Sequence, residues 1–326
     1  MPSIVCFGEA LIDFLARPPQ APDAPRQFTQ YAGGAPANVA VAVVKLGGAA
    51  TFIGMLGRDL FGDFLLASLR RAGVNTEHVL RTDAANTALA FVSLDAEGER
   101  RFSFYRPPAA DLLFRAQDFR PEWFRSAAAF HVCSNSLTEA AIGEATLTGM
   151  RQARQAGALV SMDLNLRLSL WPKESDPRPR LWSALAEADV VKLSATELAF
   201  LTEPFGDEAA VRAELWRGRP RLLVVTDGPG PMRYYTRSAA GRLNAFSIDA
   251  VDTTAAGDAF TAGLLLQLAE AGVGAAELDA LASDAGRMRT VLRFAAACGA
   301  LTATRHGSFA AVPTLDEVQA FLREHP

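Results

Sequence analysis

Lysine is the residue that this sequence most clearly lacks. Of its 326 residues only Lys45, Lys173 and Lys192 are lysines, so almost all cationic charge is arginine. None of the three follows a glycine, which excludes the G-x-x-x-x-G-K-[ST] loop of P-loop enzymes. The first apolar run carries Gly8 alone in place of G-x-G-x-x-G, and this argues against a dinucleotide-dependent dehydrogenase.

Cysteine, histidine and long apolar runs are also sparse. The three cysteines have no CxxC spacing, which predicts reduced core residues in a cytoplasmic protein. The four histidines lie too far apart for structural zinc, and His131, in an apolar run, is interpreted as a hydrogen-bonded core residue. The cysteines are Cys6, Cys133 and Cys298.

Charge and hydropathy also exclude several partners. The net charge is −4 and there is no basic block, so we predict no nucleic acid partner. No apolar run reaches membrane-spanning length, and the first residues include two acids without a basic region, unlike a signal peptide. We therefore predict a globular protein without a membrane partner.

Apolar runs alternate with helical segments, which predicts an α/β fold with a mainly parallel sheet covered on both faces. The expected strands are residues 3–8, 50–56, 127–133, 158–165, 189–194 and 221–228, and the expected helices are 37–48, 60–73, 138–157 and 180–188.

Two segments break this alternation. Residues 85–108 alternate apolar and polar side chains around the turn "DAEG", which predicts an antiparallel hairpin. Residues 10–32 contain four prolines and no helical period. We predict that both segments form one small β lid beside the ligand crevice, and that its uncovered face pairs in a homodimer. The predicted core domain is residues 1–9, 33–84 and 109–326.

The stretch "VDTTAAGDAFTAG", residues 251–263, places small residues and one carboxylate at the start of a helix. The first N–H groups of a helix have no internal partner, and the helix dipole makes that end partly positive. Small residues let an anion approach these donors. We interpret the stretch as an anion cradle with Asp258 beside it. A turn capped by Asp or Thr is the alternative.

A second glycine-rich stretch, "YAGGAPANVAVAVVKLGG", suits a polyol. Gly33 and Gly34 let the backbone approach a ligand, and Asn38 offers both a donor and acceptors. Asp13 of "GEALID" is expected just past the first strand, where ligands bind in open α/β sheets. The alternatives are an N-cap role for Asn38 and a solvated loop position for Asp13.

The segments "AGGAPANVAVAVVKLGGAATFIGMLG" and "DTTAAGDAFTAGLL" resemble the two signatures of the PfkB (ribokinase-like) sugar kinase family. The order of elements is similar over essentially the whole chain. "GEALIDF", "FYRPPAAD", "DLNLRLSLW" and "KLSATE" resemble the bacterial fructokinases in particular. The resemblance implies a ribokinase-like fold, a mainly parallel central sheet flanked by helices with a small β-sheet lid.

The resemblance also implies the catalytic residues. Asp258 would take the proton from the attacking sugar hydroxyl, and the N–H groups of Ala255, Ala256 and Gly257 would hold the transferring phosphoryl group. Arg167 would add a fixed charge, unless it is a surface arginine. Because an acid at a helix N-terminus is stabilised in its ionised form, we expect a lowered pKa for Asp258.

Further roles are implied around this centre. Glu197 of "KLSATE" would hold Mg²⁺ largely through water, although "SATE" also fits a capping box. Asn165 would face the phosphates or the sugar. Arg106, at the end of the hairpin, would close over the substrate, with an exposed lid charge as the alternative. A monovalent cation such as K⁺ is a further hypothesis for Asp252, Thr254, Arg305 and Gly307, which match cation-holding positions of some relatives.

The implied nucleotide-binding residues are Lys192, Ser194, Thr226, Gly228, Gly257, Ala296 and Gly299. Several positions depart from the family pattern. Ser194 and Ala296 stand where Asn is common, and Ala255 where Gly is frequent. Pro231 occupies the place of the second glycine of the nucleotide loop, with Gly230 one position early.

We therefore predict an enzyme that uses ATP and Mg²⁺ to phosphorylate a sugar, D-fructose to fructose 6-phosphate. The alternative enzymes are 2-dehydro-3-deoxygluconate kinase and ribokinase, because Arg106 and Arg167 suit either a neutral or an acidic sugar. The alternative outside the enzymes is a sugar-sensing homologue that has lost catalysis. The presence of Gly257, Asp258 and Glu197 disfavours it.

Overall fold

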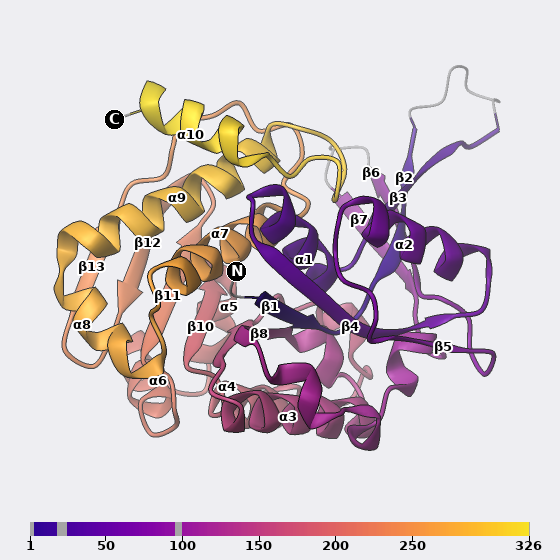
Figure 1. Ribbon diagram of the computed structural model, residues 1–326, viewed down its shortest axis with the longest axis horizontal. Helices are drawn as coiled ribbons and strands as arrows, with labels where there is room; N and C mark the ends of the chain where they lie inside the picture. The colour runs from indigo at the N-terminus through magenta and orange to yellow at the C-terminus, as the bar shows by residue number, and fades with distance from the viewer. Residues whose placement is uncertain (1–2, 18–24, 95–99, 326) are drawn as a thin grey trace.

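The computed structural model describes residues 3–17, 25–94 and 100–325 (Figure 1). The strands are β1 (Ser3–Phe7), β2 (Leu11–Ala16), β3 (Phe28–Gly33), β4 (Ala49–Gly57), β5 (Val79–Thr82), β6 (Leu89–Leu94), β7 (Arg100–Tyr105), β8 (Ala127–Cys133), β9 (Leu159–Asp163), β10 (Val190–Ser194), β11 (Leu222–Asp227), β12 (Gly230–Tyr235) and β13 (Ala240–Leu243). The helices are α1 (Ala35–Lys45), α2 (Leu60–Arg71), α3 (Ala140–Gln155), α4 (Arg178–Leu185), α5 (Ala195–Thr202), α6 (Glu208–Leu215), α7 (Ala256–Glu270), α8 (Leu278–Ser283), α9 (Ala285–Ala303) and α10 (Leu315–Glu324).

Two sheets organise these elements. The large sheet has nine strands in the order β13-β12-β11-β10-β9-β8-β1-β4-β5, and the small sheet has the order β3-β2-β6-β7. In the large sheet only β12 and β13 are antiparallel to their neighbours. The predicted α/β fold is confirmed, and each predicted strand and helix overlaps one observed element.

The large sheet is buried on both faces. In β1, Ile4 and Cys6 pack into a core with α1, α7 and α9, whereas Val5 and Phe7 pack into a second core with α3 and α4. Successive side chains of a strand point to opposite faces, so a strand covered on both sides reads as a continuous apolar run. This is why the apolar runs located the central strands.

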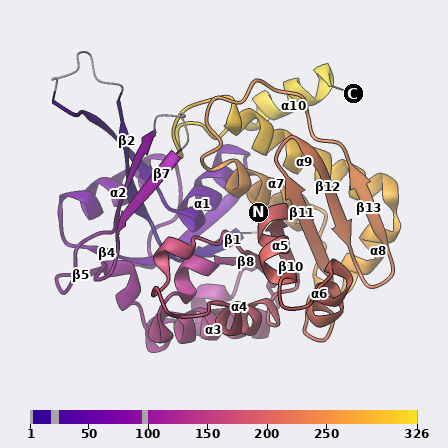
Figure 2. The same cartoon turned by 180° about the vertical axis from the view of Figure 1, so that it is seen from behind.

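The small sheet stands at one end of the molecule, beside α2 (Figures 1 and 2). One face carries Phe14, Phe28, Phe91 and Tyr105 in ring contact, and Phe14 also contacts Phe61 of α2. The segments 10–32 and 85–108 therefore do contribute to one small sheet, as predicted. The "DAEG" turn at 95–98 lies outside the described residues.

Two sequence-based expectations about single residues have definite outcomes here. Asp13 lies within β2 and pairs across to Tyr31 of β3, so it belongs to the small sheet, as expected for the segment 10–32, and the expectation that it directly follows the first strand is wrong. His131 is buried, and its Nδ1 lies 3.2 Å from Ser161 Oγ, which confirms a core residue. Burial lowers its pKa to about 3.

Within the described ranges, no single helix is long and apolar enough to cross a membrane. In those ranges, α7 and the segment Ala275–Ser283 reach the length and hydropathy of a membrane span only when they are taken together, and a bend of 94° separates them. All three cysteines are free and buried in the part of the chain that is described, as expected of reduced core residues.

Candidate active site

The carboxyl ends of three neighbouring parallel strands converge on the start of α7. Asp163 ends β9, Ser194 ends β10 and Asp227 ends β11. Side chains that follow parallel strands meet at one edge of a sheet, which is where ligands bind in open α/β folds. The site is built at this edge, with the small sheet nearby.

The first turn of α7 has the geometry of an anion cradle. Its N-cap is Ala255, with the left-handed φ of 61° and no side-chain cap, so the alternative of a turn capped by Asp or Thr is wrong. The Ala256 N–H donates to Thr253 O at 3.2 Å, so the expectation that this group is open to a phosphoryl oxygen is wrong here, whereas the Gly257 N–H makes no such bond in the described chain. A Cβ on Gly257 would lie 2.9 Å from Lys192 Nζ, so the ammonium group sits directly beneath the helix start. Positive charge and helix N–H groups thus face the same space.

Asp258 is buried in this turn and accepts a hydrogen bond from Asn38 Nδ2 at 2.7 Å. Burial raises the pKa of Asp258 to about 7, the Asn38 hydrogen bond and the charges of Lys192 and Arg167 act to lower it, and Asp163 raises it. The expectation of a lowered pKa is therefore wrong. Loss of hydration outweighs the favourable field of the helix N-terminus.

Asn38 lies inside α1, whose N-cap is Gly34 with φ 103°, so the N-cap role considered for Asn38 is wrong. A side chain on Gly34 would clash with Glu9 O at 2.5 Å, which explains the glycine. The Asn38 amide spans from α1 to Asp258, while its Oδ1 is buried without a partner in the described part of the chain. A buried, unpaired amide oxygen is costly, so it marks a place for a donor from a ligand.

A buried ion pair lies next to Asp258. Lys192 Nζ donates to Asp163 Oδ2 at 2.9 Å, and Thr261 Oγ1 donates to the same oxygen at 3.3 Å. Although burial opposes the charged ammonium, the charges of Asp163 and Glu197 raise the pKa of Lys192. Sequence reasoning placed Lys192 among the nucleotide contacts but missed Asp163, even though it is the first residue of the quoted stretch "DLNLRLSLW".

Glu197 uses both carboxylate oxygens in local hydrogen bonds. Its Oε2 accepts from Ser194 N at 2.7 Å, while Glu197 N donates to Ser194 Oγ at 3.2 Å, so the capping box is confirmed. Its Oε1 accepts from Leu166 N at 2.8 Å. Each carboxylate oxygen has a lone pair left for a second hydrogen bond, so one water-mediated contact to Mg²⁺ fits this residue.

The small sheet meets the core at Asp13. Its Oδ2 accepts from Ser308 Oγ at 3.1 Å, and a Cβ on Gly33 would lie 2.1 Å from that oxygen. Gly33 therefore allows the close approach of a carboxylate. Burial raises the pKa of Asp13 to about 6, with the Ser308 hydrogen bond acting to lower it. The alternative of a solvated loop acid is wrong for Asp13.

Arg106 is 2% exposed, so the alternative of an exposed lid charge is wrong. Its guanidinium donates to Asp111 Oδ2 at 2.6 and 2.9 Å and to Asn135 O at 2.7 Å. Asn135 Nδ2 in turn donates to Glu9 Oε1 at 2.8 Å. Burial raises the pKa of Glu9, against the charge of Arg106. Sequence reasoning missed Glu9, Asp111 and Asn135, because only the fold brings them to Arg106.

Asn165 and Arg167 lie in the loop after β9. Asn165 has φ 41°, and with Ala255 it is one of two non-glycine residues with positive φ in the described chain. Strained backbone of this kind gathers at functional sites. The Arg167 side chain is exposed, but its charge acts on Asp258. The loop therefore places one exposed cation near the buried carboxyl.

The expected nucleotide loop joins β11 to β12. Thr226 Oγ1 donates to Leu193 O at 3.4 Å, and Gly228 has φ 51° in the turn. Pro231 lies early in β12, where the pairing with β11 is irregular, and a residue without an N–H is tolerated there. Gly299 of α9 faces α7: a Cβ would lie 2.9 Å from Ala256 O. Ala296 is half-buried one turn earlier on α9.

The expected cation-binding residues meet around the buried Asp252. Its Oδ1 accepts from Thr254 N at 2.7 Å and its Oδ2 from Gly307 N at 3.2 Å. The Arg305 side chain points elsewhere, to Glu317 Oε1 at 2.6 Å. The backbone of the loop just before α7 is thereby tied to the loop after α9.

This fold and site define a class of enzyme, an α/β phosphotransferase. A helix N-terminus and a lysine are suited to hold an anion, and a buried carboxyl is suited to accept a hydroxyl proton. The sequence pattern of the pfkB family carbohydrate kinases matches residues 1–315, and the chain belongs to that family.

Individual relatives agree with this membership. The structure of fructokinase with bound ATP from Xylella fastidiosa is 54% identical in sequence, with a TM-score of 0.95 and 99% of each chain covered. Fructokinase-2 of Solanum lycopersicum is 42% identical over 324 residues, 98% of this chain and 96% of the relative. An E. coli structure with ATP and Mg²⁺ is 27% identical, with a TM-score of 0.85 over the whole of both chains.

Proposed function

We propose that this protein is a fructokinase that transfers the γ-phosphoryl group of ATP to D-fructose and forms fructose 6-phosphate. The observation that carries the proposal is Asp258, a buried carboxyl with a pKa of about 7 in the first turn of α7, 2.7 Å from Asn38. Relatives named fructokinase, 54% and 42% identical over nearly the whole chain, support the choice of fructose. They do not favour 2-dehydro-3-deoxygluconate, ribose or a role without catalysis.

In the proposed reaction the sugar hydroxyl oxygen attacks the γ-phosphorus, ADP leaves, and Asp258 takes the hydroxyl proton. Phosphoryl transfer has a loose transition state, so positioning and charge stabilisation supply most of the catalysis. The N–H groups at the start of α7 and the Lys192 ammonium face the phosphoryl position, and Arg167 adds an exposed charge. A pKa of about 7 suits a general base at neutral pH.

Buried polar atoms around this point suit the hydroxyls of a sugar. Asn38 Oδ1 and Asn135 Oδ1 are both buried without a partner within the described ranges. We assign Asn38, Asp13 and Asn135 to the sugar, with Gly33 and Gly34 giving the space. Arg106 is tied to Asp111, so it orders the Asn135 segment rather than closing over the substrate as a free charge.

We assign Mg²⁺ to Glu197 through water, together with the phosphates of ATP. Magnesium keeps several of its waters and takes one or two carboxylates, which the single Glu197 carboxylate fits. When bound, the ion neutralises phosphate charge. A monovalent cation near Asp252 is a further proposal. Its test is the initial rate in K⁺, Na⁺ and tetramethylammonium salts at equal ionic strength, and equal rates in all three would exclude it.

The aromatic face of the small sheet, which is partly covered by α2 and exposed at Phe28 and Tyr105, supports a homodimer. Phe28 is 38% and Tyr105 66% exposed, next to the rings of Phe14 and Phe91. Exposed apolar sheet faces tend to find a partner. We also propose a cytoplasmic location, which the three free thiols support. Light scattering tests the dimer, and a monomeric mass at micromolar concentration would contradict it.

The experiment for the proposed reaction compares kcat/KM for fructose, ribose and 2-dehydro-3-deoxygluconate side by side. A preference for the acid sugar or for ribose would overturn the choice of fructose. Asp258→Asn is expected to reduce kcat by about 10²–10⁴, the range for a positioned base, while ATP binding survives. Near-normal turnover in this variant would refute the role of Asp258.

A further inference from the structure

A second concave site lies at the opposite edge of the same strands. It encloses about 540 Å³ and is lined by Ala158, Asp189 and Arg221, which directly precede β9, β10 and β11. The candidate active site uses the other ends of these three strands. The length of these three strands therefore separates the pocket from the candidate active site. The volume of the pocket is within the range of small-molecule sites, about 300–1,000 Å³.

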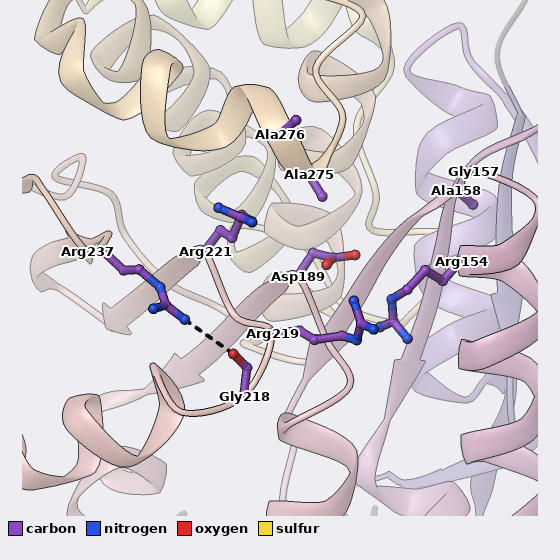
Figure 3. A pocket seen from close by; sticks show the side chains of 10 residues that line it. All are labelled: Arg154, Gly157, Ala158, Asp189, Gly218, Arg219, Arg221, Arg237, Ala275 and Ala276. Carbon is purple, nitrogen blue, oxygen red and sulfur yellow. Dashed lines mark hydrogen bonds between the residues drawn. The ribbon is translucent and has the colours of Figure 1, made fainter.

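Four arginines line this pocket, from α3, from the segment before β11 and from the turn before β13 (Figure 3). Arg154, Arg219 and Arg221 surround Asp189, and each acts electrostatically on its carboxyl group. Asp189 Oδ2 accepts from Val160 N at 2.9 Å, which fixes the carboxyl at the pocket wall. The remaining arginine, Arg237, donates to Gly218 O at 3.3 Å, as the dashed line shows.

Several of the arginine donors lack an acceptor in the described chain. Arg154 Nε is buried without a hydrogen-bond partner. Arg219 approaches Glu187 Oε2 only at 3.7 Å, beyond hydrogen-bond length, and its side chain is 56% exposed. Arg221 makes a 3.3 Å contact to Asp279 and is 44% exposed. Arg219 and Arg221 therefore keep N–H donors open to solvent at the cavity, while Arg154 Nε is buried in its wall without an acceptor in the described chain.

The charge of this cluster is also unbalanced. Glu187 is shared by Arg154 and Arg219 and by Arg151, which lies outside the pocket. Five guanidinium groups thus stand against the carboxylates of Glu187, Asp189 and Asp279, an excess of two positive charges. A phosphate monoester carries about two negative charges at neutral pH, which matches this excess.

We propose that this arginine pocket binds a sugar phosphate at a site distinct from the active site. The phosphate group accepts from Arg219 together with Arg154 and Arg221, because guanidinium forks match phosphate oxygens. The carboxylate of Asp189 accepts from sugar hydroxyls, a role that a site for bare phosphate would not need. The cavity has room for both parts of such a ligand.

The test is calorimetric titration with fructose 6-phosphate of the wild type, Arg219→Gln and Arg217→Gln. The Arg219 side chain makes no hydrogen bond in the described chain, and its backbone bond to Ala186 O does not depend on the side chain, so Arg219→Gln should leave the fold intact. Arg217 is the matched control: its side chain is 79% exposed, and it pairs with Glu214 outside the pocket. We expect Arg219→Gln to weaken one binding event at least about tenfold, as expected for loss of a charged hydrogen bond, and Arg217→Gln to leave it unchanged.

The number of binding events separates this proposal from the proposed function. If both are right, the wild type binds two equivalents, one of them as product in the active site. If only the fructokinase proposal fails, the wild type binds one equivalent of fructose 6-phosphate, in the arginine pocket, and Arg219→Gln loses this binding event. Identical isotherms for wild type and Arg219→Gln would overturn the pocket. Inorganic phosphate should bind the pocket more weakly, and equal affinity would overturn the assignment to a sugar phosphate.

Discussion

Asn38 Nδ2 donates to Asp258 Oδ2 over 2.7 Å and joins α1 to the first turn of α7, although 220 positions separate the two residues. This hydrogen bond acts against burial and the nearby Asp163, which both raise the pKa of Asp258. The balance leaves a pKa of about 7. The carboxyl therefore changes its protonation state in the range where an enzyme of this class would work.

Turnover should rise with pH through about 7, because Asp258 accepts a proton only when ionised. Asn38→Leu removes a hydrogen bond that lowers this pKa, so the rising limb of the kcat profile should move up by about one pH unit. The measurement is kcat against pH at saturating substrates. Asn75→Leu, an exposed position, is the control. A limb that stays in place in Asn38→Leu would contradict the assignment.

The same pKa shift predicts how stability depends on pH. The carboxyl of Asp258 holds its proton more tightly in the folded than in the unfolded chain. Wild-type stability should thus fall as pH rises from about 4 to about 7. Asp258→Asn removes this penalty, so its gain in Tm over the wild type should grow between about pH 4 and pH 7 and level off above that. Asp249→Asn, at an exposed position, is the control for the substitution itself. A constant gain for Asp258→Asn would refute the buried-acid account.

Sequence reasoning located the central elements well because each strand is covered on both faces. Ile4 and Phe7 belong to different cores, so both must be apolar and the strand is visible as a run. The expectation that Asp13 directly follows the first strand was wrong for the opposite reason. Strand β2 belongs to the small sheet, whose pairing with β3 and β6 depends on contacts that no local pattern encodes.

In the site, features that depend on local backbone geometry were easier to predict than those that depend on burial and on charges from distant parts of the chain. The cradle at Gly257 follows from local helix chemistry alone. The pKa of Asp258 did not, because desolvation depends on how deeply the fold buries the turn. Glu9 and Asp163 were missed for the same reason, since their partners Asn135 and Lys192 come from distant strands and loops.

The ion pair of Arg106 and Asp111 gives a stability prediction. Both side chains are at most 4% exposed. Arg106→Met leaves Asp111 as an uncompensated buried charge and should lower the free energy of unfolding by about 3–5 kcal/mol. The double variant Arg106→Met, Asp111→Leu should recover most of the lost free energy of unfolding. Urea unfolding measures each variant.

The exposed pair of Arg58 and Asp83 is the matched control for that experiment. Arg58→Met should change the free energy of unfolding by about 1 kcal/mol or less, because solvent screens exposed pairs. A double variant of Arg106 and Asp111 as unstable as Arg106→Met alone would show that the guanidinium contact to Asn135 O, not the ion pair, carries the stability.

Gly257→Ala tests the cradle. The new Cβ would lie 2.9 Å from Lys192 Nζ, so the ammonium group must move away from the phosphoryl position. Misplacement near 1 Å costs about 100-fold in rate, and we expect a fall in kcat of about 10–100-fold. Gly143→Ala is the control, because its Cβ meets only Leu137 atoms at 3.9 and 4.0 Å, also in the first turns of a helix. Unchanged kcat in Gly257→Ala would remove Lys192 from the cradle.

Glu197→Gln separates the proposed magnesium role from helix capping. Glu197 caps α5 with Ser194, and Glu317 makes the equivalent capping box with Thr314 on α10. We expect Glu197→Gln to raise the Mg²⁺ concentration for half-maximal activity about tenfold, the lower bound for changes to residues around a metal ligand shell. Glu317→Gln should lower Tm by weakening the charged bond to Arg305, since a glutamine can still cap the helix, while the Mg²⁺ dependence stays as in the wild type. If both variants lose stability and neither changes the Mg²⁺ dependence, Glu197 is a helix cap alone, and the ion must be held by other groups.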